Sequence, residues 1–347
     1  MTPPRRRTAV EIDRVSIVFG DKPPTALPFM DDGLDRAEVQ EKCGQVLGVH
    51  DCSLAVAEGE ILVLMGLSGS GKSTLLRAIN GLNRVVRGVV RVSDGDTLID
   101  VTNADAKTLR RIRLSRVAMV FQQFGLLPWR TVRDNVGLGL ELGGMAKAAR
   151  RAKADEKLEM VGLSDWADRM VAELSGGMQQ RVGLARAFAT DAPILLMDEP
   201  FSALDPLIRT RLQDELIELQ KTLRRTIIFV SHDLDEAFKL GDRIAIMEGG
   251  RIVQVGSPRE IFTAPADDYV SDFVAQMNPL GVLTARDVMG PPGGVAGAEV
   301  DPATPVREVM TLLAREAEVV AVVDEDGRTL GRITRDMVLA RLLDPRG

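Results

Sequence analysis

An apolar run, a glycine-rich loop and a helical pattern follow one another directly, and this succession constrains the fold more than any other feature. The run is "ILVLM", the loop is "GLSGSGKS" from Gly66 to Ser73, and the helix continues as "TLLRAING". Glycines let backbone N–H groups turn toward phosphate oxygens, Lys72 reaches the β- and γ-phosphates, and the Ser73 hydroxyl serves Mg²⁺. The predicted ATP-binding residues of this segment are Gly66, Ser68, Gly69, Ser70, Gly71, Lys72, Ser73 and Thr74.

Other apolar runs alternate with helical patterns. Residues 9–19 alternate apolar and polar side chains as a half-buried strand does, and Gly33 to Val46 is typical of a short polar helix. From about Val132 to Val171 the pattern is helical, and another helix begins after Asp205. Alternating strands and helices indicate an α/β fold with a parallel sheet. Further strands are predicted at 50–56, 60–66, 116–121, 193–200, 225–232 and 243–250.

The C-terminal part has a different composition. Residues 279–300 are rich in Gly and Pro, as in "MGPPGGVAGA", and predict a linker. Residues 301–347 predict a small α+β unit. It contains a helix with Val306 and Val309 on its inner face, the strand "VVAVV", a turn at Asp326-Gly327, the strand "TLGRIT" and the final helix "RDMVLARLL".

Composition excludes several other kinds of protein. The 347 residues carry a net charge of −6, which argues against a nucleic-acid surface. No apolar stretch approaches about 18 residues, so no transmembrane helix is expected, and the first residues lack the apolar segment of a signal peptide. Cys43 and Cys52 are too few for a disulfide framework or a metal cluster. A cytosolic protein of two domains is expected.

Acidic and imidazole side chains lie at the ends of two of the predicted strands. Asp198 comes directly after "ILLM" and is placed to hold the Mg²⁺ that bridges the β- and γ-phosphates. Glu199 is placed to act as general base on the attacking water. His232 ends "FVSH", where an imidazole can hydrogen-bond the γ-phosphate and that carboxylate. The other histidine, His50, has no motif around it and is expected to be structural.

Two further motifs place polar groups near phosphate. Gln122 ends a strand and can contact Mg²⁺ or the attacking water, with Gln123 beside it as the alternative. The segment "LSGG", which ends at Gly177, closes a loop and begins a helix. Its Ser175 hydroxyl, glycine N–H groups and helix N-terminus make a second anion site, or else only an N-cap with a tight turn.

In this order the motifs resemble those of the ATP-binding subunits of ABC transporters. "GLSGSGKS", "FQQFGLLPW", "LSGGMQQR", "ILLMDEP", "SALD" and "SHD" look like the Walker A, Q-loop, signature, Walker B, D-loop and switch-histidine motifs, and together they cover about residues 8–275. The insertion "DKPPTALPFMDDGLDRAEVQEKCGQVLGVHDCSL" and the run "LSGGMQQRVGLARAFATDAPILLMDEPFSALDPLIR" are similar to importers of glycine betaine, choline and related quaternary amines. Among these, the chain looks most like the choline-type subunit.

The resemblance implies a fold and boundaries. Residues 1–278 are expected to form a P-loop NTPase core of the ABC ATPase type, with an antiparallel β subdomain, a helical subdomain at about 125–175 and the insertion at about 21–47. Many betaine-type subunits end in a tandem pair of CBS units, whereas residues 301–347 supply a single CBS-like unit. Its "ITRDM" also shortens the Thr-x-x-Asp spacing that often holds the ribose of adenosine.

The resemblance also implies a homodimer in which two subunits face each other head to tail. Each ATP then lies between the phosphate loop of one subunit and the signature turn of the other. The residues implied to act in trans are Ser175, Gly176, Gly177 and, in the D-loop, Asp205. Phe19 is the implied aromatic that stacks on adenine. Trp129 is either an anchor for a helix of the membrane subunit or a buried core residue.

The implied function is hydrolysis of ATP, with Mg²⁺, to drive import of a quaternary amine. The implied partners are an integral-membrane permease and a periplasmic or membrane-attached substrate-binding protein, at the cytoplasmic face of a bacterial cell membrane. One alternative is a soluble ABC ATPase acting in DNA repair or on ribosomes, which usually carries long coiled-coil arms or two cassettes. Another is a regulatory nucleotide sensor with the C-terminal unit as its output. No nucleic-acid partner is expected.

Overall fold

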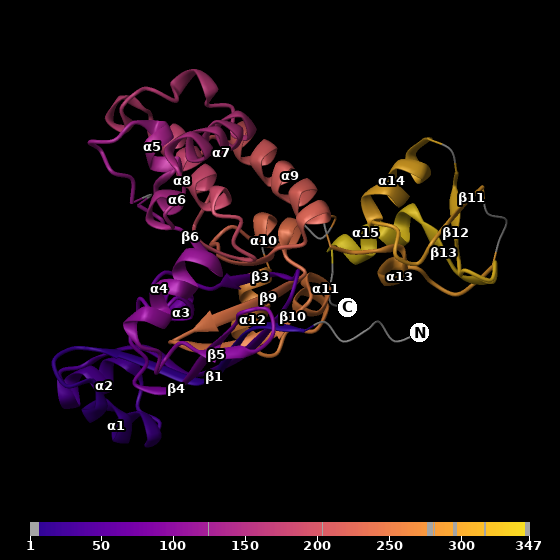
Figure 1. Cartoon of the computed structure of the whole chain (residues 1–347). Coiled ribbons are helices and arrows are strands. Elements are labelled where there is room, and N and C mark those ends of the chain that lie inside the picture. The colour runs from indigo at the N-terminus through magenta and orange to yellow at the C-terminus, as the bar shows by residue number, and fades with distance from the viewer. Residues whose placement is uncertain are drawn as a thin grey trace. The chain divides into compact units, whose positions relative to one another are not determined.

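The computed structural model describes residues 7–343 except 124, 203, 276–279, 281, 294–296 and 316. The chain divides into two compact units (Figure 1). One contains Met1–His232 with Ala245–Val253, and the other contains Asp233–Ile244 with Gln254–Gly347. No helix among the residues described is both long and apolar enough to span a membrane.

An antiparallel sheet forms one part of the first unit. Its strands are β1 (Thr8–Phe19), β2 (Val46–Ala57), β4 (Arg87–Ser93) and β5 (Leu98–Asp100), in the order β2-β1-β4-β5. Every neighbouring pair is antiparallel. This sheet is the antiparallel β subdomain that the resemblance implied, although β4 and β5 were not among the strands predicted from periodicity.

The insertion connects β1 to β2 as three short helices beside this sheet (Figure 1). They are η1 (Pro23–Ala26), α1 (Leu27–Asp31) and α2 (Arg36–Cys43). The shared core contains Val18, Ala26, Met30, Val39 and Leu47. A capping box between Asp35 and Glu38 fixes the start of α2, and Gly44, with φ at +69°, ends it. The insertion is therefore packed and capped rather than a loose loop.

A second sheet has six strands in the order β10-β9-β3-β8-β7-β6. Their bounds are β3 Ile61–Met65, β6 Val117–Val120, β7 Ile194–Asp198, β8 Thr226–Val230, β9 Arg243–Glu248 and β10 Arg251–Gly256. The pairs β3–β8, β8–β7 and β7–β6 are parallel. Every residue of β3, β7 and β8 is buried, as expected for parallel strands covered on both faces. The predicted parallel α/β sheet is thus confirmed.

Helices belonging to this sheet include α3 (Lys72–Ile79), α4 (Ala106–Ser115) and α9 (Pro206–Leu223). The predicted cap of α9 is confirmed, since a carboxylate oxygen of Asp205 accepts a hydrogen bond from the Ile208 backbone N–H at 3.0 Å. A separate helical group contains α5 (Val132–Val136), α6 (Leu138–Leu142), α7 (Lys147–Met160) and α8 (Gly176–Ala189), which share one hydrophobic core. Trp129 is 69% exposed, so the alternative that it is a core residue is wrong.

The second unit includes α10 (Leu234–Leu240), α11 (Pro258–Thr263) and α12 (Asp268–Val274). Its C-terminal part has a three-stranded sheet in the order β11-β12-β13, with β11–β12 parallel and β12–β13 antiparallel. The predicted helix and strands are confirmed as α14 (Val306–Arg315), β12 (Val319–Val323) and β13 (Thr329–Thr334), followed by the predicted helix α15 (Arg335–Leu343).

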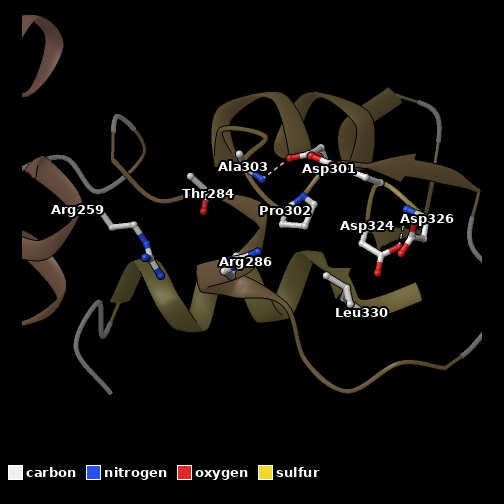
Figure 2. Close-up of a pocket in the computed structure, with 10 residues that line it drawn as sticks. Arg259, Thr284, Arg286, Asp301, Pro302, Ala303, Asp324, Asp326 and Leu330 are labelled. Carbon is white, nitrogen blue, oxygen red and sulfur yellow. Dashed lines mark hydrogen bonds between the residues drawn. The ribbon is translucent and has the colours of Figure 1, made fainter. Parts of the chain in front are cut away.

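The range predicted to be a linker holds two elements of this unit, α13 (Ala285–Val288) and β11 (Ala298–Val300). A Gly/Pro-rich composition does not prevent short elements from pairing with a neighbour, and β11 pairs with β12. Beside α13 lies a cavity of about 560 Å³, with Arg259 and Arg286 on one side and Asp324 and Asp326 on the other (Figure 2).

Candidate functional site

Four neighbouring parallel strands have their carboxyl ends at one cavity. Gly66 follows β3, Gln122 comes just after β6, Glu199 follows β7 and His232 comes just after β8. Ligands of parallel α/β sheets bind outside these strand ends. The cavity has a volume of about 590 Å³. Among its lining residues are Phe19, Arg36, Val46, Leu47, Gly48, Ser68, Gly69, Gly71, Lys72, Ser73, Thr74, Gln122, Glu199 and His232.

The loop between β3 and α3 requires glycine at two of its positions. Gly66 has φ at +139°, and a Cβ there would lie 2.1 Å from the Met247 carbonyl oxygen. Gly71 has φ at +101°, and a Cβ there would lie 2.6 Å from the Gly48 carbonyl oxygen. A left-handed backbone that also presses against other backbone atoms admits only glycine. The loop is therefore held in one tight shape before any ligand binds.

Lys72 lies inside this loop and is 7% exposed. Its Nζ donates hydrogen bonds to the carbonyl oxygens of Gly66 and Leu67, both at 2.8 Å, and to the Ser70 hydroxyl at 3.3 Å. Burial lowers the pKa of Lys72, while the nearby carboxylates oppose that shift. An ammonium group held only by neutral oxygens is ready to transfer its hydrogen bonds to phosphate oxygens.

Asp198 is fully buried and has donors on both of its carboxylate oxygens. The Ser73 hydroxyl donates to Oδ1 at 2.6 Å, and Arg77 donates to Oδ2 from Nη2 at 2.7 Å and from Nε at 3.2 Å. A buried charge is tolerated only when it is paired and hydrogen-bonded in this way. The arrangement brings Ser73 and Asp198, the two predicted metal-binding residues farthest apart in sequence, into direct contact.

Glu199 has three polar neighbours, of which Gln122 and His232 were predicted to belong to the site and Gln180 was not. Its Oε2 accepts a hydrogen bond from Gln122 Nε2 at 3.1 Å and lies 3.6 Å from Nδ1 of His232. Of the two neighbouring glutamines, Gln122 lines the cavity and contacts Glu199, and Gln123 is not among the lining residues named above. The backbone of Glu199 has φ at +50°, a left-handed conformation that non-glycine residues adopt at functional sites. Gln180 Nε2 donates to the Glu199 carbonyl oxygen at 3.4 Å.

Phe19 lies against a glycine on the neighbouring strand. A Cβ at Gly48 would lie 2.8 Å from the Phe19 ring and 3.1 Å from the methyl group of Thr74. Phe19 is 42% exposed and lines the cavity. A flat aromatic surface in this place can stack on a purine.

The signature residues lie outside this cavity. Ser175 caps α8 by accepting a hydrogen bond from the Met178 N–H at 3.4 Å, and Ser175 and Gly176 are both exposed. Gln179 Nε2 donates to the carbonyl oxygens of the preceding loop, 3.1 Å to Leu174 and 3.3 Å to Val171. Of the two turns predicted to bind anions, then, only the loop between β3 and α3 lines this cavity, and Asp205 caps α9.

Arg36, Arg77 and Gln180 belong to the site although sequence reasoning did not identify them. Arg77 could have been found, because it lies four residues after Ser73 and so on the same face of α3. Arg36 lies in the insertion and contacts residues far along the chain, so no local pattern points to it. His50 is 5% exposed and is not among the cavity residues named above.

The family model and the most similar known proteins all concern ATP-binding proteins of transport systems. Residues 49–202 match the family model for the ABC transporter ATPase region, described as "ABC transporter". The chain is 46% identical over 341 residues to the glycine betaine/proline betaine transport system ATP-binding protein ProV of Salmonella typhimurium, which covers 97% of this chain and 84% of that protein. It is 42% identical over 331 residues to the trimethylamine N-oxide transport system ATP-binding protein TmoW of Ruegeria pomeroyi, covering 94% of each.

Two further matches bear on substrate and assembly. The choline transport ATP-binding protein OpuBA of Bacillus subtilis is 43% identical over 229 residues, covering 66% of this chain and 58% of that protein. Among solved structures, the dimeric post-hydrolysis state of the ATP-binding cassette MJ0796 bound to ADP and Pi aligns with a TM-score of 0.62 at 31% identity. The alignment covers 72% of this chain and 99% of that cassette.

Proposed function

Because the chain belongs to the ATP-binding subunits of glycine betaine and choline ABC importers, we propose that it is the energy-coupling ATPase of a transporter for a quaternary ammonium compound. The observation that carries the proposal is the meeting of Lys72, Glu199 and His232 at one cavity beside a glycine-constrained loop. The loop N–H groups and Lys72 would bind the β- and γ-phosphates, and the ring of Phe19 would stack on adenine.

The geometry around Glu199 supports hydrolysis rather than binding alone. Its Oε2 would accept a proton from water while the water oxygen bonds to the γ-phosphorus, and the bond from that phosphorus to the β–γ bridging oxygen breaks to release ADP. His232 and Gln122 both lie beside the same carboxylate oxygen and would fix its orientation toward the water. A base positioned by two neighbours contributes by orientation as well as by basicity.

The residues present fit a magnesium ion. A hydroxyl, an amide and a carboxylate supply the hard oxygen ligands that Mg²⁺ prefers, and the Ser73 and Asp198 oxygens already lie 2.6 Å apart. Ser73, Gln122 and Asp198 would hold the ion, which neutralises charge on the β- and γ-phosphates when bound.

The separation of the two anion-binding turns supports hydrolysis in a head-to-tail dimer. Ser175 and Gly177 would complete the site of the partner subunit, with Gly176 and Asp205 beside them. The dimeric cassette bound to ADP and Pi aligns with 72% of this chain. Contacts to the γ-phosphate that exist only in the closed dimer would favour closure when ATP binds and opening after hydrolysis.

The decisive test is Glu199→Gln, with the exposed Glu248→Gln as the matched control. We expect Glu199→Gln to bind ATP with little change, to lose turnover by about a hundredfold or more, and to accumulate as a dimer with ATP and Mg²⁺. Size-exclusion chromatography and phosphate release measure these outcomes. Wild-type turnover in Glu199→Gln would contradict the assignment of the base.

The partners and substrate follow from the relatives. Their names speak of glycine betaine, proline betaine, choline and trimethylamine N-oxide, all small methylated amines. We infer an integral-membrane permease that docks near the exposed Trp129, a substrate-binding protein, and a location at the cytoplasmic face of a bacterial membrane. The choline-type assignment is tested by competing radiolabelled choline against glycine betaine for uptake through the complete transporter.

A soluble ABC ATPase acting in DNA repair or on ribosomes is the alternative. An ATPase rate that rises with DNA or ribosomes, and not with the permease in lipid, would favour it. The C-terminal unit is proposed to be CBS-like on the basis of its order of strands and helices. Its cavity lies beside α13, and removal of the unit without any change in transport regulation would argue against a sensory role.

A further inference from the structure

The insertion between β1 and β2 brings a positive charge into the nucleotide cavity. Arg36 is the first residue of α2, and the capping box at Asp35 and Glu38 fixes its position. The Arg87 guanidinium donates to both carboxylate oxygens of Asp31, at 2.7 and 3.0 Å, and so ties α1 to β4. Arg36 therefore extends into the cavity from a helix whose backbone is held in place by packing, capping and an ion pair.

The Arg36 guanidinium contacts backbone oxygens on both sides of the cavity. Nη2 donates to the Gly48 carbonyl oxygen at 2.9 Å, and Nη1 donates to the carbonyl oxygen of Gly69 in the phosphate loop. Gly48 is also the residue on which the Phe19 ring lies. Arg36 thus joins the proposed adenine platform to the phosphate loop.

The space around this guanidinium is kept open by a third glycine. Gly250 has φ at +88°, and a Cβ there would lie 3.0 Å from Arg36 Nη2 and 3.0 Å from the Gly48 carbonyl oxygen. A Cβ at 250 would crowd both Nη2 and the Gly48 carbonyl oxygen to which it donates. The backbone therefore accommodates an arginine at this place.

The charge of Arg36 has no acidic partner within the part of the chain that the structure describes. No ion pair joins it to a carboxylate anywhere in the described ranges, and its Nε is buried with no hydrogen-bond partner. Burial lowers the pKa of Arg36, and no acidic group among the described residues offsets that effect. A half-buried guanidinium with unused donors is a site for an anion, and planar guanidinium groups bind phosphate especially well.

Lys72 provides a comparison within the same cavity. Its ammonium is likewise held by carbonyl oxygens of the phosphate loop, at Gly66 and Leu67. Both cations therefore donate hydrogen bonds to neutral carbonyl oxygens of the phosphate loop, Lys72 from α3 and Arg36 from the insertion. We propose that Arg36 is a further nucleotide-binding residue, which contacts the phosphate chain of ATP and so makes the insertion part of the ATP site. The inference rests on the proposed function, since it requires ATP in this cavity.

The test compares Arg36→Gln with Lys42→Gln in the full-length chain. Lys42 is an exposed cation in the last turn of the same helix, so both variants remove one positive charge from α2. Dissociation constants are measured for ATP, ADP and adenosine, together with the melting temperature of the nucleotide-free protein. We expect Arg36→Gln to weaken ATP and ADP by about tenfold and to leave adenosine unchanged. Lys42→Gln should match the wild type.

Arg36→Lys retains the charge but not the planar fork, and it should recover part of the ATP affinity at most. Equal ATP affinity in Arg36→Gln and Lys42→Gln would overturn the inference. So would an equal loss for ATP and adenosine with a lower melting temperature, because that pattern belongs to a residue that only supports the loop. Failure of the proposed function is distinct, since the wild-type protein and Lys42→Gln would then both fail to bind ATP.

Discussion

Arg77 shows how a single residue beyond the recognisable motifs can govern a charged site. Asp198 is fully buried, and Ser73 and Arg77 each satisfy one of its carboxylate oxygens. Loss of one partner of a buried ion pair leaves the other charge uncompensated. Because Arg77 is itself 38% exposed, water partly screens the pair and moderates the cost.

At this scale we predict that Arg77→Gln lowers the free energy of unfolding by about 1–2 kcal/mol. We also expect it to raise the Mg²⁺ concentration needed for ATPase activity, since one oxygen of Asp198 loses its anchor. Urea unfolding and a magnesium titration measure the two effects, with Arg84→Gln, an exposed arginine, as control. An Arg77→Gln protein that matches this control in both measurements would contradict the role given to the pair.

Among the elements, α13 depends on a carboxylate that is almost fully buried. The Asp287 side chain is 3% exposed. Its Oδ1 accepts from Arg259 Nη2 at 2.5 Å and Nε at 2.8 Å, and its Oδ2 accepts from the Thr284 N–H at 3.0 Å and hydroxyl at 2.8 Å. Burial acts to raise the pKa of Asp287, but the hydrogen bonds from Arg259 and Thr284 outweigh it and hold the pKa below its usual value.

A group whose pKa is lowered by folding stabilises the protein above its unfolded pKa, near 4 for aspartate, and this contribution is lost as the pH falls through the folded value. We therefore predict that the contact between α11 and α13 loses stability below about pH 4. At neutral pH, Asp287→Asn should cost about 1–3 kcal/mol. Hydrogen exchange of the α13 amides reports the effect, and the exposed Asp326→Asn serves as control. Equal protection in both variants would count against the link between α11 and α13.

The elements that the sequence predicts well are those whose signal is local. The buried strands β3, β7 and β8 are uninterrupted apolar runs, and Asp205 marks the start of α9 by itself. Strand β4 mixes arginine, glycine and valine and has no uninterrupted apolar run. Its burial depends on pairing with β1 and β5, so its own sequence does not predict it. Site residues inside motifs were predicted in the same way, whereas Arg36 reaches Gly69 across 33 positions, a contact that no spacing rule reveals.

For the whole molecule, the proposed division of the ATP site between the phosphate loop of one subunit and the signature turn of its partner predicts that neither subunit hydrolyses ATP alone. Ser175→Arg should abolish ATPase activity although Lys72 and Glu199 of the same chain are untouched. Lys72→Ala should do the same from the other half of the site. Mixing the two inactive variants rebuilds one complete site in each mixed dimer, so activity should return to roughly a quarter of the wild-type rate.

The unmixed variants are the controls for this experiment, and phosphate release is the measurement. Unaltered activity in Ser175→Arg alone would show that the signature turn takes no part in hydrolysis.

The same segment contains Met178, followed by two glutamines. That residue packs against the helical core, while Gln179 and Gln180 hold the preceding loop and Glu199. The two glutamines thus donate hydrogen bonds to backbone oxygens, and the proposed anion contacts fall to Ser175 and the glycines.

The left-handed backbone of Glu199 sets the stability of the protein against its proposed ATPase activity at one position. Glycine adopts φ near +50° without steric cost, whereas any side chain there costs about 1 kcal/mol or more. A lineage selected for thermal stability alone would therefore drift toward glycine at 199 and fall silent as an ATPase while folding better than before. With Glu199 as the proposed general base, selection for hydrolysis would oppose that drift, so the residue at 199 would indicate whether a related protein still hydrolyses ATP.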